Sequence, residues 1–114
     1  MTGKNETAYW EQIENYIQNE FNVLPEVHNI LFLIGIQELG YGFQKLDKDT
    51  KVKVINFASI FVLKYINDKD IAHIKNNFPD RYEKDYETKY EEEIYKLAII
   101  RYFREKNILK NNNK

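Results

Sequence analysis

The chain has 114 residues and a net charge of −1, and 43% of its residues are hydrophobic. This length indicates one domain with a core of its own, and the composition excludes a disordered chain. Because cysteine is absent, disulfides, thiolate metal sites and cysteine nucleophiles are excluded. The longest apolar run, residues 30–36, is far shorter than the span of about 20 residues that a bilayer requires, and the residues after Met1 do not resemble a signal peptide. We therefore expect a cytoplasmic protein, and the many Ile, Lys, Asn and Tyr residues favour an A/T-rich bacterial genome.

The charged residues form four blocks of alternating sign. Residues 1–43 carry one Lys and six Glu, residues 44–77 carry seven Lys and four Asp, residues 78–95 carry three basic and seven acidic groups, and residues 96–114 carry six basic groups and one acidic group. Such blocks suit a compact fold whose acidic and basic faces meet, or a self-associating surface. They argue against nucleic-acid binding by the whole domain, which usually needs a net basic footprint.

Two amphipathic or apolar segments open the chain. Residues 7–21 are predicted to form a helix, because their apolar residues recur with a period of 3.6. Residues 25–39 are predicted to form a second helix, with Pro25 at its first position and Gly40 as its C-cap. The middle of this helix is apolar on every side, which is typical of a buried helix. Gly35 costs about 1 kcal/mol relative to Ala in a helix, so we expect a neighbouring helix to approach closely there.

Residues 50–66 are predicted to form the third helix, although part of this segment also has the character of a strand. Val52, Ile55, Ser59, Val62 and Ile66 make one helical stripe, and a second apolar stripe adjoins it. The segment is also rich in β-branched residues, and residues 50–54 alternate like a strand. A strand over residues 50–57 therefore stays open, but a length of 17 residues without Gly or Pro favours a helix.

The C-terminal third is predicted to hold a short helix over residues 69–77 and a last helix over residues 88–106. Thr88 and Glu91 have the spacing of a capping box at the start of the last helix. The predicted core face of that helix consists of Tyr90, Ile94, Leu97, Ala98 and Tyr102. The fold class is then all-α, a small bundle of four to five helices with the second and third helices at its centre. The domain spans residues 7–107, between a flexible N-terminus of residues 1–6 and a disordered polar tail of residues 108–114.

The segment LFLIGIQELG, residues 31–40, followed by Gly42 and Lys48-Asp49, resembles a family of small Bacteroidetes proteins that has no established activity. The resemblance covers about residues 9–66, with a weaker echo in residues 91–103. It implies a lineage and a helical fold but no function. The family pattern has a His in the third helix near the position of Asn56, so a shared metal or acid–base role does not carry over to this chain.

Polar residues at the end of the second helix mark a candidate pocket. Gln37 and Glu38 follow the apolar segment, and with His28 and Tyr41 they form a possible binding or interaction site. The alternative is that they face solvent or cap a neighbouring helix. His28 and His73 are the two histidines, but the chain has neither His-x-x-x-His nor Glu-x-x-His, so we predict no metal site and no cofactor. We also assign no catalytic residue, because the chain has no Gly-rich phosphate loop and a single serine.

Two further groups are candidate contact surfaces. Tyr82, Tyr86 and Tyr90 recur every four residues and form a possible interaction ridge; the alternative is a half-buried stripe at the edge of the core. A possible basic patch near the C-terminus comprises Arg101, Arg104 and Lys106. This patch could touch RNA or a membrane surface, or it could simply compensate the helix dipole.

The leading hypothesis is a non-enzymatic protein–protein interaction module, either a homodimer or a partner for another bacterial protein. Its grounds are the segregated charge blocks, the abundant Tyr and two helices that are apolar over most of their girth. The second hypothesis is a small-molecule-binding protein or minor enzyme with a pocket near the end of the second helix. The third is a nucleic-acid-associated regulator that uses the basic C-terminus.

Overall fold

A computed structural model describes residues 3–41, 46–76, 86–106 and 108–109, with side chains from residue 8 to 41, 46 to 76, 90 to 106 and 108 to 109. These residues form five α-helices, one 3-10 turn and no strand, which confirms the predicted all-α fold class. The elements are α1 (Gly3–Phe21), α2 (Val27–Leu39), α3 (Lys48–Val62), η1 (Leu63–Tyr65), α4 (Asp68–Asn76) and α5 (Tyr86–Lys106). The molecule is flat, with extents of 42 × 40 × 23 Å.

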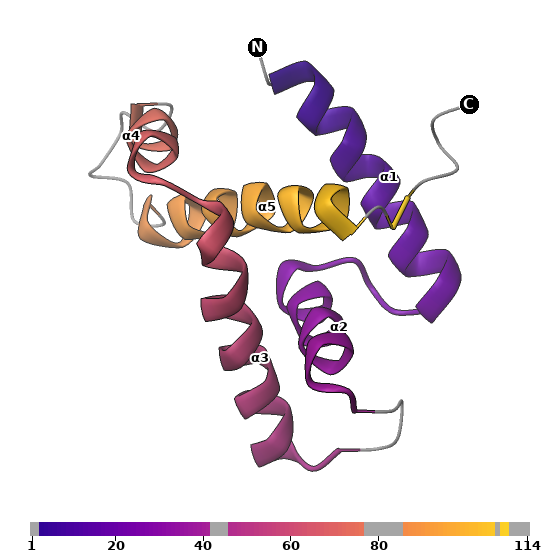
Figure 1. The fold of residues 1–114 in the computed structure, drawn as a ribbon. Coiled ribbons are helices and arrows are strands. Elements are labelled where there is room, and N and C mark those ends of the chain that lie inside the picture. Colours follow the sequence, from indigo (N-terminus) through magenta and orange to yellow (C-terminus); the bar gives the residue numbers. More distant parts are fainter. Residues whose placement is uncertain (1–2, 42–45, 77–85, 107, 110–114) are drawn as a thin grey trace.

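The helix α5 runs across the centre of the molecule and contacts every other helix (Figure 1). The prediction that the second and third helices are central is therefore incomplete. These two helices pack closely on each other, but α1 and α4 have their main contacts with α5. The main core, to which α1, α2, α3, α5 and the segment after α5 all contribute, consists of Trp10, Ile13, Ile17, Ile30, Leu31, Ile34, Ala58, Val62, Ala98, Ile99, Ile100, Tyr102, Phe103 and Leu109.

The helix α1 begins at Gly3, so it extends into the segment for which we expected a flexible N-terminus. Its predicted apolar stripe faces α5: Trp10, Ile13 and Ile17 are buried. Asn22 ends the helix in the left-handed region, with φ at 56°, and its N–H donates to the Gln18 carbonyl at 3.0 Å. Asn is one of the few residues besides Gly that adopts this conformation readily, which is why α1 can stop here without a glycine.

The helix α2 begins at Val27, two residues after the predicted start at Pro25. The reason is a tight turn around Pro25, in which the Glu26 N–H donates to the Leu24 carbonyl at 2.8 Å. This turn leaves Glu26 as the N-cap residue. At the other end, the predicted C-cap is confirmed, because Gly40 has φ of 82° and its N–H donates to Ile36.

The close approach expected at Gly35 is confirmed, and the neighbour is α3. A Cβ atom at position 35 would lie 2.5 Å from Val54 Cγ1 and 2.7 Å from the Val54 carbonyl oxygen. Only a residue without a side chain permits this backbone contact. The loss of helix propensity at Gly35 is thus offset by packing between α2 and α3.

Residues 50–57, for which a strand stayed open, are helical. The Asp47 carboxylate caps α3 by accepting the Thr50 N–H at 2.8 Å, so the helix begins two residues before the predicted position. Tertiary packing on α2 overrides the β-propensity of this segment. The last turn of the predicted helix is the 3-10 turn η1, and the backbone of Ile66, the predicted end of the helix, is extended.

The helices α4 and α5 agree with the prediction in type, and α5 ends at Lys106 as predicted, but both helices begin earlier than predicted. Asn67 and Asp70 cap α4 reciprocally, since each backbone N–H donates to the other side chain at 2.9 Å. The helix α5 begins at Tyr86, so Thr88 lies inside it and does not cap it. The predicted tail residue Leu109 is buried against the core, and Ile108 packs beside it. The core therefore continues past residue 107.

Candidate functional site

A polar cluster joins the end of α2 to the end of α5. The Tyr102 hydroxyl donates to Glu38 Oε2 at 2.7 Å, and Lys106 Nζ lies 3.5 Å from the same oxygen. The Glu38 side chain is only 18% exposed, so two partners from α5 satisfy a carboxylate that water reaches poorly. The arrangement stabilises the contact between two helix ends that are 64 residues apart in the sequence.

Tyr102 lies at the centre of an aromatic group. Its ring is 1% exposed and meets Phe61 and Tyr65 edge to face, at centroid distances of 6.1 and 6.3 Å. Burial, followed by the hydrogen bond to Glu38 and the charge of Glu38, raises the pKa of Tyr102 far above its ordinary value. Tyr102 thus stays protonated and acts as a hydrogen-bond donor, which suits a structural tether better than a nucleophile or base.

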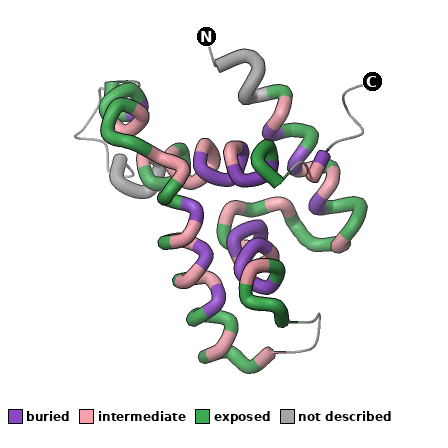
Figure 2. Tube along the Cα trace, viewed as in Figure 1, coloured by how far each residue is buried: buried purple, intermediate pink, exposed green. Residues whose placement is uncertain are grey.

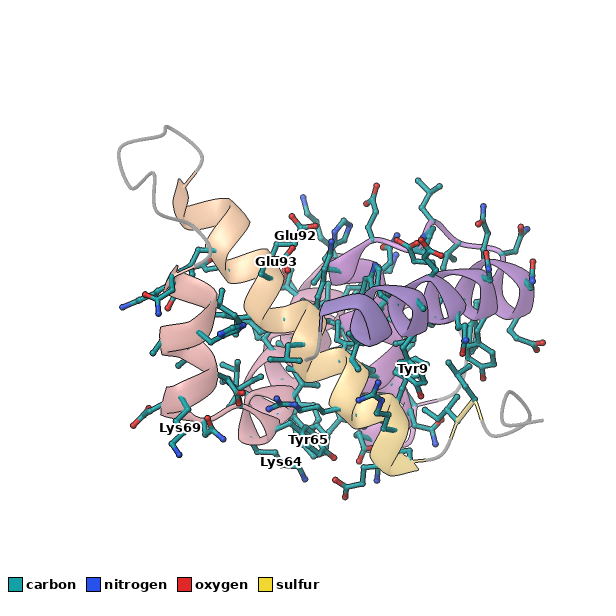
Figure 3. All side chains as sticks on the ribbon, turned by 90° about the horizontal axis from the view of Figure 1, so that it is seen from above. Tyr9, Lys64, Tyr65, Lys69, Glu92 and Glu93 are labelled. Atoms are coloured by element: carbon teal, nitrogen blue, oxygen red, sulfur yellow. The ribbon has the colours of Figure 1, made fainter. Side chains whose placement is uncertain are left out.

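The neighbouring Tyr65 hydroxyl is buried, and the Glu105 carboxylate is among the polar groups near it. Burial, and then the nearby negative charge of Glu105, raise the pKa of Tyr65 above its ordinary value. Figure 3 shows Tyr65 beside Lys64 next to α5. Both tyrosines of this group therefore stay neutral at physiological pH.

A second polar link joins α4 and η1 to α5. Arg101 Nη1 and Nη2 donate to the two Asp70 carboxylate oxygens at 2.6 and 3.0 Å, and Nη1 also donates to the Tyr65 carbonyl at 2.8 Å. The hydrogen bonds from Arg101 are the main reason why the pKa of Asp70 is lowered. Asp70 thus contacts both Arg101 and the N-terminal cap of α4.

The candidate pocket residues at the end of α2 are not brought together. Glu38 belongs to the polar cluster, Gln37 is exposed, and Tyr41 is 41% exposed beyond Gly40. His28 lies ten residues before Glu38, which is about 15 Å along the helix axis, and its ring is 3.5 Å from the exposed Glu26 carboxylate. A pocket that needs His28 and Glu38 together therefore does not form.

A groove of about 380 Å³ lies instead at the junction of α1 and α2. It is lined mainly by apolar side chains, with one carboxylate and one amide among them. The lining residues are Glu20, Phe21, Val23, Asn29, Phe32 and Leu33. The groove falls within the size range of about 300–1,000 Å³ that small-molecule sites occupy.

The basic patch predicted near the C-terminus has contacts inside the molecule. Arg101 pairs with Asp70, Lys106 lies near Glu38, and the Arg104 guanidinium stands 4.7 Å from the centroid of the Tyr9 ring. The three cations thus form ion pairs or a cation–π contact with residues of other helices. They reduce the positive surface that would be available to a nucleic acid, so this function stays the third prediction.

The predicted tyrosine ridge lies mostly beyond what the structure describes. Tyr82 and the side chain of Tyr86 lie outside the described residues. Tyr90 is partly buried, and Lys75 Nζ from α4 lies 5.8 Å from its ring centroid. The ridge therefore stays a prediction.

The outer face of α3 carries the most exposed apolar side chain of the described residues. Ile60 is 75% exposed, Val52 is 49% exposed and Leu63, the next residue after the helix, is 36% exposed. With Asn56 between them, these residues follow the spacing of one helix face. Figure 2 shows buried and exposed stretches alternating along α3, as expected for a helix with one covered face. We call Val52, Asn56, Ile60 and Leu63 the α3 outer stripe.

Sequence reasoning did not identify this surface, because it placed Val52 on one of two adjoining apolar stripes without deciding which stripe faces solvent. The residues that α3 buries are Val54, Ala58 and Val62, which point towards α2 and α5. The available signal was the apolar character of α3 around its whole girth. The neighbouring helices α2 and α5 cover only part of the α3 surface, so some of its apolar side chains remain exposed to solvent.

No protein-family model, curated protein or solved structure matches the chain. The resemblance to the small Bacteroidetes proteins thus stays a prediction. Nowhere in the described part of the chain do three His, Asp or Glu side chains gather so that they could hold a metal ion. Within the same residues, no helix is both long enough and apolar enough to cross a membrane.

Proposed function

We propose that this chain is a non-enzymatic protein-interaction module and that the α3 outer stripe is its contact surface. The observation that carries the proposal is the 75% exposure of Ile60 in line with Val52 and Leu63. Burying such a side chain fully in an interface contributes about 1.5–3 kcal/mol, so the stripe offers a partner a substantial hydrophobic contact. Apolar surface that a fold leaves uncovered along one helix is typical of a protein contact site.

The polar cluster of α2 and α5 supports a non-enzymatic role. Its carboxylate, Glu38, already accepts hydrogen-bond or charge contacts from Tyr102 and Lys106. A general base needs a carboxylate whose lone pairs point to a substrate proton. Here Glu38 Oε2 is engaged by Tyr102 and Lys106 and helps to hold two helices together.

The experiment is a selection of helical peptides on the immobilised protein, followed by comparison of two variants. Ile60→Asp places a charge in the stripe, and Lys69→Asp makes a matched surface change on exposed α4. We expect selected peptides to lose binding to Ile60→Asp and to keep binding to Lys69→Asp. Light scattering of the chain alone, with 13.8 kDa as the monomer mass, tests whether a second copy occupies the stripe. The proposal would be overturned if the chain is a monomer by light scattering and Ile60→Asp leaves the binding of the selected peptides unchanged.

A second candidate function rests on the groove between α1 and α2. Phe21, Phe32 and Leu33 provide apolar walls, and Glu20 and Asn29 provide polar groups at the same groove. This is a suitable lining for a small apolar molecule with one polar end. Saturable binding of such a compound that Leu33→Trp abolishes, with an unchanged melting temperature of the free variant, would favour this candidate over the interaction module.

A further inference from the structure

We infer that the partner presents an amphipathic helix whose apolar stripe is bordered by Glu and Asp, and that this helix lies along α3. The inference rests on the proposed function, because it specifies the chemistry of the partner at the same surface. Three observations lead to it: the length of the apolar stripe, the aromatic border beside it and the sign of the charges around it.

The length and width of the stripe fit one helix. Val52 and Leu63 are eleven residues apart, which corresponds to about 16 Å or three helical turns. Phe57 and Phe61 widen the surface on one side; they are half-buried, and their rings stack at a centroid distance of 5.7 Å. A short amphipathic helix recognises such a surface through anchors at helical spacing.

The charges around the stripe are mainly positive. Lys48, Lys53 and Lys64 are exposed beside the stripe, and Asp49 is exposed three residues before Val52 on the same helix face, which gives a net charge of +2. No described carboxylate lies within 4.0 Å of these lysines, although the hydrogen bonds from Thr50 and, to a smaller extent, the charge of Lys53 lower the pKa of Asp47. Lys64 Nζ is held 4.2 Å from the centroid of the Phe61 ring, so this cation stands at the aromatic border of the stripe.

Charge also decides between an acidic helix and a second copy of this chain. Two α3 faces brought together would place two surfaces of net charge +2 in one interface. Juxtaposed like charges disfavour a complex, whereas complementary charges raise its association rate and select the partner. Asp49 on the same face lowers the net charge of each surface to +2 but does not reverse its sign. An acidic border on the partner therefore fits the surface better than a second copy.

The test uses three synthetic helical peptides with the same Leu stripe and with Glu, Gln or Lys at the bordering positions. Their affinities for the full chain are measured by fluorescence anisotropy at low and high salt. We expect the Glu-bordered peptide to bind about tenfold more tightly than the Lys-bordered peptide, and high salt to reduce the difference. Lys53→Glu should selectively weaken the binding of the Glu-bordered peptide, and Ile60→Asp should weaken the binding of all three peptides. Lys69→Glu on α4 makes the same charge change away from the stripe and serves as the control.

The other outcomes separate the inference from the proposed function. Equal binding of the three peptides, still lost in Ile60→Asp, would overturn the acidic partner and leave the interaction surface in place. If the wild-type chain is a dimer by light scattering and Ile60→Asp is a monomer, the acidic partner would also be overturned, because a second copy of the chain would occupy the stripe. Peptide affinities that Ile60→Asp leaves unchanged, together with a monomeric mass, would overturn both.

Discussion

At the end of α5, the cations Arg101, Arg104 and Lys106 each contact another helix or turn of the chain. Along α3, Lys48 and Lys53 are exposed and have no described carboxylate within 4.0 Å. Both regions looked similar in the sequence, as basic residues interspersed with apolar ones. The difference teaches that basic residues with a similar sequence pattern can be held in close contacts between elements in one region and remain exposed in another.

The apolar residues of the two regions differ in the same way. Ile99 on α5 is fully buried, whereas Ile60 on α3 is 75% exposed. The same side chain thus stabilises the fold in one region and is available for contact in the other. This contrast can be tested directly with variants.

The largest effect is expected from Ile99→Ala. Removing a fully buried Ile side chain leaves a cavity in the core, so we expect a loss of about 3 kcal/mol in the free energy of unfolding. Ile60→Ala is the matched control, because it makes the same chemical change on the exposed face, and its effect should stay within about 0.5 kcal/mol. Urea unfolding followed by circular dichroism measures both. Similar losses in the two variants would mean that the α3 outer stripe is covered in solution.

The next effect concerns the ion pair between Asp70 and Arg101. Asp70→Asn removes the short ion pair with the partly buried Arg101, and we expect a loss of about 2 kcal/mol at pH 7. Because the folded-state pKa of Asp70 is lowered from its ordinary value of 3.8, its contribution is present above that value and is lost as the pH falls through the folded-state pKa. The difference between wild type and Asp70→Asn should therefore shrink below about pH 4, as thermal unfolding at a series of pH values would reveal. A constant difference would exclude ionisation of Asp70 as its cause.

A smaller effect is expected from Tyr102→Phe. The variant keeps the buried ring but removes the hydrogen bond to Glu38, while Lys106 remains near the carboxylate. We expect a loss of about 1.5 kcal/mol in the free energy of unfolding. Tyr95→Phe on the same helix is the control, since no hydrogen bond of its hydroxyl is present in the described residues, and it should change stability by less than about 0.5 kcal/mol. Equal effects of the two variants would show that the Tyr102–Glu38 contact contributes nothing in solution.

Features that depend on one residue and its neighbours were predictable from the sequence. Gly40 ends α2 because a positive φ favours glycine, and Gly35 marks the contact with α3 because a Cβ atom would not fit there. The apolar period of α1 likewise placed Trp10, Ile13 and Ile17 in the core. These features leave a local pattern that a reader of the sequence can recognise.

The site features depend on residues far apart in the chain and were not predictable in the same way. Glu38 was singled out as a polar residue at the end of an apolar helix, but its partner Tyr102 lies 64 residues away. On α3, apolar residues surround the helix, so their spacing does not say which arc faces solvent. That choice follows from where α2 and α5 pack, and only the tertiary structure determines it.

The central position of α5 bears on how the chain acquires its structure during translation. Synthesis proceeds from the N-terminus, so α1 to α4 emerge from the ribosome before the helix that all of them contact. The helices α2 and α3 are neighbours in the sequence, so their contact can form early, whereas the apolar face of α1 stays uncovered until α5 is synthesised. Nascent chains that stop before residue 86 should thus expose Trp10 and Ile13 and be susceptible to aggregation or chaperone capture. The synthesis of α5, rather than of any earlier helix, closes the core.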